Sequence, residues 1–147
     1  MESILFTDEY FMKQALLEAQ KAFSIGEIPV GCVVVSNNQI IGKGHNLTER
    51  LNDVTAHAEM QAITAAANFL GAKYLNDCTI YITLEPCIMC AGAIFWAQFN
   101  RVVYAASDDK RGFQKALVNL HPKTKIENGI LANEAADLMK QFFKNLR

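Results

Sequence analysis

The sequence predicts an α/β fold, a three-layer α/β/α sandwich with helices on both faces of one mixed sheet. Helically spaced apolar segments alternate with short β-branched runs, and no linker, repeat or low-complexity segment divides the 147 residues. Such alternation is typical of layered α/β folds. A composition of 51% hydrophobic and 20% charged residues fits a globular protein. We therefore expect one domain, residues 1–147, that buries its core without disulfides.

The first predicted element is an amphipathic helix over residues 8–23. Apolar residues recur there at the i, i+3, i+4 and i+7 positions that form one face of a helix. Thr7 or Asp8 is the expected N-cap, because both side chains can accept a backbone hydrogen bond. Gly26 and Pro29 end the helical pattern.

A β-hairpin is predicted next. A β-branched run leads to Asn37-Asn38, and a second apolar run, Ile40-Ile41, follows at once. Asparagine tolerates the left-handed backbone of a two-residue hairpin turn, so the chain should reverse at this pair. Residues 42–46 then lead into a polar loop.

A second helix is predicted from Thr55 to about Leu70, with Gly71 placed to stop it. This assignment puts His57 and Glu59 in the first helical turn.

A strand over residues 79–83 then runs into Pro86, a residue favoured at the first position of a helix. The helical pattern continues to Phe99, so Cys87 and Cys90 should share one face near the helix N-terminus. The positive end of the helix dipole lowers the pKa of thiols placed there, which suits charged metal ligands.

Four further segments complete the alternation. They are a strand over 101–106, a partly helical segment over 108–120, a short strand or loop over 125–128 and a closing helix over 131–146.

The motifs His57-x-Glu59 and Cys87-x-x-Cys90 together predict a catalytic zinc site. Three protein ligands leave a coordination position for water, whose pKa the metal lowers to about 7. Glu59 need not bind the metal and is close enough to carry protons to a leaving amine. A redox motif would need no His-x-Glu, and a zinc ribbon would need a second C-x-x-C pair. The implied chemistry is hydrolytic deamination.

The two remaining cysteines do not form such a pair. Cys32 lies within a β-branched run and Cys78 just precedes an apolar strand. Both are interpreted as small buried hydrophobic residues, so metal binding is favoured over two disulfides.

The same motifs resemble the H-x-E…P-C-x-x-C signature of zinc nucleobase deaminases. Within that superfamily, the chain is similar to the bacterial tRNA adenosine deaminases. The similarity is carried by Phe11-Met12, residues 26–31, 55–59, 83–87 and 129–131, and Phe142-Phe143. The resemblance implies a cytidine deaminase-like fold with five strands and one Zn²⁺ per chain. It further implies conversion of the wobble adenosine in a tRNA anticodon stem-loop to inosine.

The resemblance also implies substrate contacts from Asn46, Ala58, Glu85, Asp108, Lys110 and Phe143. Residue chemistry alone offers other roles for several of them. Asn46 can pair with a base edge or form a turn, and Asp108 can contact a ribose or cap a helix. For Glu85 we favour capping of the helix N-terminus by its charge over lining the pocket.

Near the C-terminus, Phe142, Phe143 and Arg147 match family residues near the RNA path, although the two phenylalanines also fit a core position. His45 and His121 are interpreted as loop or supporting residues rather than metal ligands.

Charge is divided unevenly along the chain. Residues 1–109 carry 6 Lys/Arg and 12 Asp/Glu, a net charge of −6, whereas residues 110–147 carry 8 and 3, a net charge of +5. The basic segment fits either a polyanion-binding surface or a solvated helix face. The sequence has no candidate membrane helix and no recognisable signal peptide, so a cytoplasmic location is expected. The family suggests a homodimer, which is compatible with the aromatic segment that contains Phe95, Trp96 and Phe99.

Other deaminases remain as alternatives. Where the family usually has Gly, Ala and Ser after Gly112, this chain has residues 113–116 in the sequence Phe-Gln-Lys-Ala. The pair Phe95-Trp96 resembles the sequence of bacterial guanine deaminase, an enzyme that acts on a free base. A cytidine or deoxycytidylate deaminase would share the zinc motifs, and a non-catalytic partner subunit would lack Glu59. The residues alone do not settle the identity of the base.

Overall fold

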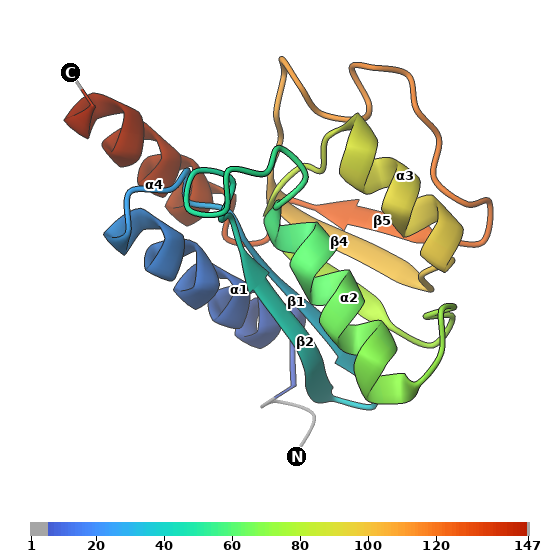
Figure 1. Cartoon of the computed structure of the whole chain (residues 1–147). Helices are drawn as coiled ribbons and strands as arrows, with labels where there is room; N and C mark the ends of the chain where they lie inside the picture. Colours follow the sequence, from blue (N-terminus) through green and yellow to red (C-terminus); the bar gives the residue numbers. More distant parts are fainter. Residues whose placement is uncertain (1–5, 147) are drawn as a thin grey trace.

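A computed structural model describes residues 6–146 and confirms the α/β/α sandwich with five strands (Figure 1). The sheet order is β2-β1-β3-β4-β5, with β1 antiparallel to both of its neighbours and β3, β4 and β5 parallel. In chain order the elements are α1 (Asp8–Ser24), β1 (Gly31–Ser36), β2 (Gln39–His45), α2 (Ala58–Leu70), β3 (Thr79–Leu84), α3 (Ile88–Ala97), β4 (Arg101–Ala106), β5 (Lys125–Asn128) and α4 (Ala132–Asn145).

Two cores lie on opposite faces of the sheet, because successive strand residues point to opposite sides. Helices α1 and α4 cover one face, and α2 and α3 cover the other (Figure 1). The first core receives Val33, Val35, Tyr81, Val103 and Ala105 from the strands. The second receives Cys32, Val34, Ile80, Ile82, Val102 and Tyr104, and it also buries Cys78. The prediction that Cys32 and Cys78 are buried is confirmed.

The local signals at the start of the chain are also confirmed. The Thr7 hydroxyl oxygen accepts a hydrogen bond from the backbone N–H of Tyr10 at 3.1 Å, so Thr7 is the N-cap of α1. Asn37 and Asn38 have φ angles of 51° and 60°, the left-handed pair that a type I′ hairpin turn requires.

The segment over residues 108–120 forms turns instead of the expected partial helix. In a helix, its backbone N–H groups would bond to carbonyls four residues earlier. Here Phe113 donates to the Pro86 carbonyl at 2.9 Å, and Gln114 donates to the Glu85 carboxylate at 3.1 Å. These two bonds to the connection between β3 and α3 interrupt the helical pattern, of which the bonds from Gly112 to Asp108 and from Ala116 to Gly112 remain.

One edge of the sheet collects the segments that matter for the site. Strands β2, β3 and β4 all end there, and β1 begins there because it is antiparallel to β2 and β3. The backbone N–H of Gly31 donates to the Thr83 hydroxyl at 3.0 Å, which joins the start of β1 to the end of β3. The loop after β2, the connection before α3 and the segment after β4 thus leave from a common edge.

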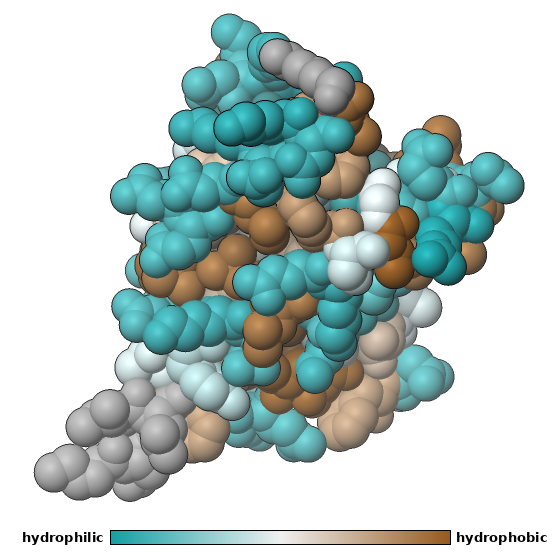
Figure 2. Space-filling model, turned by 90° about the vertical axis from the view of Figure 1, so that its left-hand side faces the viewer, coloured by the Kyte–Doolittle hydropathy of each residue, from teal (hydrophilic) through white to brown (hydrophobic). Residues whose placement is uncertain are grey.

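Hydrophilic side chains predominate on the face of the molecule that Figure 2 shows, and apolar side chains appear between them. No helix within residues 6–146 combines the length and the apolarity needed to cross a membrane.

An ion-pair network ties α1 to the sheet. Asp8 accepts hydrogen bonds from the Tyr81 hydroxyl and from the Arg101 guanidinium, both at 2.7 Å, and Arg101 also contacts Glu127. The hydrogen bond from Arg101 lowers the pKa of Asp8 below its usual value, although burial acts in the opposite direction.

We expect Asp8→Asn to lower the free energy of unfolding by about 1 kcal/mol at neutral pH, since charge-assisted hydrogen bonds at partly exposed sites contribute on this scale. The folded-state pKa of Asp8 is depressed, so its contribution is present above the unfolded value of about 3.9 and is lost as the pH falls through the lower folded value. Urea unfolding across a pH series should show that the difference in free energy of unfolding between the variant and the wild type narrows below about pH 4. The exposed neighbour variant Glu9→Gln serves as the control, and a pH-independent gap would contradict the assignment.

Candidate active site and metal centre

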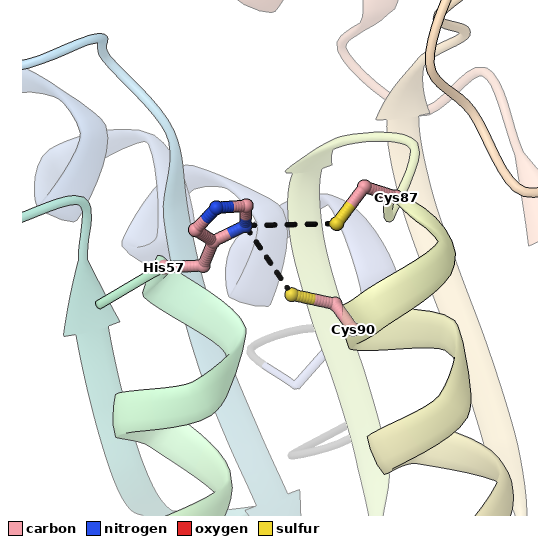
Figure 3. A group of neighbouring side chains, drawn as sticks. All are labelled: His57, Cys87 and Cys90. Carbon is pink, nitrogen blue, oxygen red and sulfur yellow. Dashed lines mark hydrogen bonds between the residues drawn. The ribbon is translucent and has the colours of Figure 1, made fainter. Parts of the chain in front are cut away.

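The three predicted metal ligands meet at the edge of the sheet where α2 and α3 begin (Figure 3). His57 Nδ1 lies 3.7 Å from Cys87 Sγ and 3.5 Å from Cys90 Sγ. Helix α2 starts three residues and α3 two residues later than the sequence suggests, so His57 and Cys87 are the N-cap residues and, of the three ligands, Cys90 alone lies within a helix. Pro86 accordingly precedes the N-cap of α3, and that helix ends at Ala97 rather than Phe99.

The donor set fits a zinc ion. Zinc binds thiolate sulfur at about 2.3 Å and imidazole nitrogen at about 2.0–2.1 Å, so tetrahedral coordination separates these two atoms by about 3.6 Å. The observed separations of 3.5 and 3.7 Å agree with that value. All three ligand atoms lie within 4.8 Å of one another. His57, Cys87 and Cys90 could therefore hold one zinc ion.

The electrostatics of the cluster favour a bound cation. A hydrogen bond from Cys90 lowers the pKa of the Cys87 thiol to about 4 against the effect of burial, and His57 lowers it further. The same contact with Cys87, together with burial, raises the pKa of Cys90. The hydrogen bond to Cys87 also raises the pKa of His57. A thiolate thus forms readily beside two groups that hold protons, and a metal ion can replace those protons.

Glu59 lies two residues after His57, in the first turn of α2, where its side chain is enclosed. The residue is 4% exposed, and burial raises the pKa of its carboxyl group to about 7. The nearby negative charge of Cys87 also raises this pKa, while His57 and Cys90 lower it. A carboxyl group with a pKa near neutrality can accept and release a proton under physiological conditions.

A close approach of α2 to β2 fixes the start of the zinc-bearing helix. A Cβ atom added to Gly44 would lie 2.2 Å from the Ala58 carbonyl oxygen, so no larger residue fits at this point of β2. Ala58 itself is fully buried. Its side chain packs in the core, and as the first residue of α2 its backbone N–H is among those without an intrahelical acceptor.

Glu27 was missed by the sequence analysis. It is completely buried, and its two carboxylate oxygens accept the backbone N–H groups of Glu49 at 3.1 Å and Arg50 at 2.7 Å. Glu27 thereby anchors the loop between β2 and α2. A carboxylate in an otherwise apolar segment that leads into a buried strand was the available signal.

Glu85 anchors the segment on the other side of the site. Its carboxylate accepts the backbone N–H groups of Asp108 at 2.9 Å and Gln114 at 3.1 Å. The interpretation that the charge of Glu85 caps the N-terminus of α3 stays a prediction. A Cβ atom on Gly112 would lie 2.3 Å from the Glu85 carboxyl carbon, which explains the glycine at that position.

Asn46 and Asp108 both stabilise turns through their side-chain oxygens. Asn46 Oδ1 accepts the backbone N–H of Thr48 at 3.3 Å, and Asp108 Oδ1 accepts those of Lys110 and Arg111, both at 3.0 Å. Asn46 follows β2 and Asp108 follows β4 by two residues, so they flank the metal ligands along the sheet edge. The side chain of Lys110 is exposed.

The C-terminal aromatic pair divides between the core and the surface. Phe142 is buried against Phe23, whereas Phe143 is 42% exposed on α4. Helix α4, which carries Phe143, packs on the face of the sheet opposite to α2 and α3. Arg147 lies outside the described residues.

The other two histidines lie apart from the cluster. His45 Nδ1 is 3.2 Å from a Glu18 carboxylate oxygen, and His121 packs on the ring of Phe95. Phe113 is a core residue that packs edge-on against Tyr104.

Comparison with known sequences places these features in context. A family model for the cytidine and deoxycytidylate deaminase zinc-binding region matches residues 6–106. A tRNA-specific adenosine deaminase of Aquifex aeolicus is 43% identical over 144 residues, which cover 95% of each chain. The enzyme of the same name from Streptococcus pyogenes is 42% identical and covers 94% of this chain and 91% of its own.

Solved structures give the same picture of the fold. A structure from a study of A-to-I editing by tRNA:A34 deaminases at the wobble position superposes with a TM-score of 0.80 at 38% identity. It covers 88% of this chain and 98% of its own. Guanine deaminase from Bacillus subtilis is 46% identical over 67% of this chain and 64% of its own, with a TM-score of 0.64.

Proposed function

This chain belongs to the cytidine and deoxycytidylate deaminase zinc-binding family, and we propose that it converts the wobble adenosine of a tRNA anticodon to inosine. The observation that carries the proposal is the cluster of His57, Cys87 and Cys90 with the buried Glu59 beside it. Relatives that span nearly the whole chain at 42–43% identity and bear the name tRNA-specific adenosine deaminase support the choice of substrate. A tRNA substrate implies a cytoplasmic location.

His57, Cys87 and Cys90 would hold the zinc ion, which when bound lowers the pKa of water and acts as a Lewis acid. Glu59 accepts the proton that water loses as its oxygen bonds to C6 of adenine. It delivers this proton to the ring nitrogen, then takes the remaining proton of the C6 hydroxyl and passes it to the amine, so a C6=O bond forms as the C6–N bond breaks and ammonia leaves. Proton transfer by a positioned side chain contributes typically about 10²–10⁴-fold to such a rate.

Substrate recognition would use the two loops that flank the ligands. Asn46 lies after β2 and Asp108 lies after β4, so a base extruded from the anticodon loop would enter between them. We assign the base edge to Asn46 and the neighbouring ribose to Asp108. Ala58 contributes the start of α2, Glu85 holds the loop of Asp108, and Lys110 and Phe143 are assigned to the RNA backbone and bases.

Guanine deaminase is the second candidate, because the Bacillus subtilis enzyme of that name is 46% identical over the part that aligns. The decisive experiment incubates the zinc-loaded protein with an anticodon stem-loop carrying a wobble adenosine, and separately with guanine, cytidine and deoxycytidylate. We expect inosine in the stem-loop and little ammonia from the free compounds. Turnover of guanine without inosine formation at any salt concentration would move the assignment to guanine deaminase.

Binding of the stem-loop should weaken steeply with salt, because each neutralised phosphate releases counterions. Lys110, Arg111 and Lys115 are all exposed on the segment after β4. We expect their joint replacement by glutamine to weaken binding. The slope of log affinity against log salt concentration should become shallower by about two, because each lost phosphate contact contributes about 0.7–0.9 to that slope.

Zinc content should not change in this variant. The matched control replaces three exposed lysines of the acidic part, Lys13, Lys43 and Lys73, by glutamine. An equal loss of salt dependence in both triple variants would show that net charge matters and the segment after β4 does not.

A homodimer is part of the proposal. Helix α3 exposes Ile88 and Trp96, the latter 73% exposed, although Phe99 is fully buried and cannot contribute to an interface. An apolar helix face of this kind is typical of a subunit contact. Light scattering should give twice the 16.3 kDa of one chain at micromolar concentration, and the Trp96→Glu variant should shift the mass toward 16.3 kDa.

A further inference from the structure

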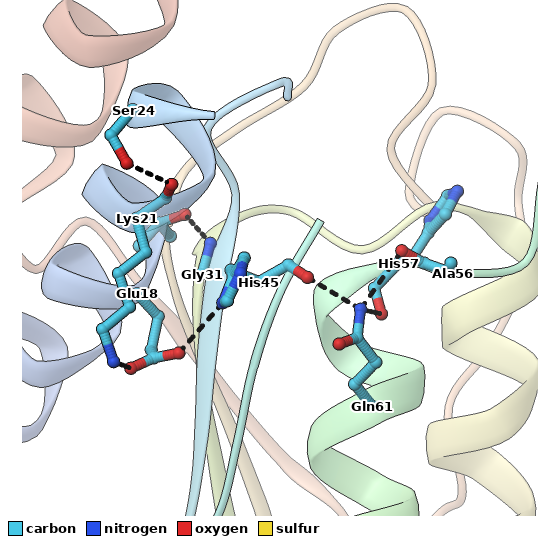
Figure 4. Close-up of polar contacts among 9 residues, drawn as sticks. Glu18, Lys21, Ser24, Gly31, His45, Ala56, His57 and Gln61 are labelled. Atoms are coloured by element: carbon cyan, nitrogen blue, oxygen red, sulfur yellow. Dashed lines mark hydrogen bonds and ion pairs between the residues drawn. The ribbon is translucent and has the colours of Figure 1, made fainter. Parts of the chain in front are cut away.

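Gln61 makes a set of contacts that the deamination chemistry does not use. It is half-buried on α2, four residues after His57. Its side-chain Nε2 donates to the backbone carbonyl of His45 at 2.7 Å, and it lies 3.3 Å from those of Ala56 and His57 (Figure 4). An amide group has two N–H hydrogens, so the short bond to His45 uses one and the other two carbonyls share the second.

These three carbonyls belong to three different parts of the site. His45 is the last residue of β2, an edge strand of the sheet. The Ala56 carbonyl closes the loop between β2 and α2, where it also accepts the backbone N–H of Leu47 at 3.0 Å. The His57 carbonyl belongs to the peptide that carries the imidazole ligand. One side chain therefore ties the ligand's own backbone to the sheet and to the loop.

The His45 end of this link is itself held from the other face of the sheet. Glu18 of α1 is buried, and one of its carboxylate oxygens lies 3.2 Å from His45 Nδ1. The other oxygen accepts a hydrogen bond from Lys21 at 2.7 Å. Figure 4 shows the sequence of contacts from α1 through the end of β2 to the start of α2. The residue whose carbonyl accepts the shortest hydrogen bond from Gln61, His45, is thus itself held in place by α1.

We propose that Gln61 is a positioning residue for the metal centre, which fixes the His57 peptide and thereby the direction in which Nδ1 faces Cys87 and Cys90. The inference rests on the proposed zinc site. His57 is the N-cap, with an extended backbone (φ −76°, ψ 157°), and its side chain makes no cap hydrogen bond. Within the described residues, the hydrogen bonds of Gln61 to the carbonyls of His57, Ala56 and His45 restrain the His57 peptide from the side of α2. Loss of an outer contact to a metal ligand typically costs about 10–100-fold in metal affinity.

The test replaces Gln61 by methionine, which keeps the length and helix propensity of the side chain and removes its donors. Gln20→Met, at an exposed glutamine of α1, is the matched control. Zinc affinity is measured by chelator competition, and the absorption spectrum of the cobalt-substituted protein reports the arrangement of the thiolate ligands. We expect Gln61→Met to weaken zinc binding by about tenfold or more and to shift the absorption bands of the cobalt-substituted protein. The substitution should lower kcat by a larger factor than the factor by which it changes KM.

Gln61→Asn is the second variant, because it keeps the amide but is one methylene too short to reach the His45 carbonyl; it should behave like Gln61→Met. Wild-type zinc affinity and an unchanged cobalt spectrum in either folded variant would overturn the proposal. Failure of the wild-type protein to bind zinc would instead overturn the metal centre itself. Failure to deaminate RNA despite normal zinc binding would affect only the proposed substrate.

Discussion

Replacement of both Cys87 and Cys90 by alanine should remove the zinc ion and abolish turnover. The double variant leaves His57 as the only protein ligand of the cluster, and one imidazole does not retain zinc against dilution. The zinc content, measured by elemental analysis after gel filtration, should fall from about one zinc per chain to near zero. Product formation should fall below detection.

Cys78→Ala provides the matched control for this result, because Cys78 is a buried cysteine outside the cluster. It should keep the full zinc content, with at most a modest loss of stability from the shortened core side chain. Zinc retained at the wild-type level in the double variant would mean that the metal is held elsewhere in the protein.

Replacement of Glu59 by alanine should separate the chemistry from metal binding. The carboxyl group is buried beside the ligands but is not one of them, so zinc content and the far-ultraviolet circular dichroism spectrum should stay unchanged. The single-turnover rate should fall by about 10²–10⁴-fold, the usual contribution of a general acid and base. Glu59→Gln should give the same loss, because an amide of nearly equal size cannot accept and release the proton.

Glu9→Gln on the exposed surface of α1 should retain the wild-type rate and zinc content. If Glu59→Ala kept more than about a tenth of the wild-type rate with zinc bound, another group would have to transfer the proton.

Local sequence signals were sufficient for most of the fold because they depend on neighbours a few residues apart. The spacing of apolar residues predicted α1 to within one residue, and the asparagine pair predicted the hairpin turn. The spacing of His57, Cys87 and Cys90 predicted a cluster that the structure forms. The error was small and systematic: both ligand-bearing helices begin later than their patterns, because the ligands adopt extended N-cap conformations.

Contacts between distant residues could not be predicted in the same way. Glu27 bonds to backbone N–H groups 22 and 23 residues further along the chain, and Glu85 bonds to groups 23 and 29 residues further. Glu27 was not identified from its own neighbourhood, and the bonds that Glu85 accepts from the later segment were not predicted. The turns that replace the expected helix after β4 have the same origin, because their shape depends on Glu85 rather than on local propensity.

The separation of the metal ligands along the chain has a consequence for folding. His57 and Cys87 are 30 residues apart and belong to two units, the hairpin with α2 and the segment that runs from β3 through α3 to β4. The cluster exists only once these units have docked, so zinc binds the native state in preference to the unfolded chain. By mass action, each tenfold rise in free zinc above its dissociation constant then adds about 1.4 kcal/mol to the stability of the protein. Metal supply would thus set the folded fraction of the enzyme as well as its activity.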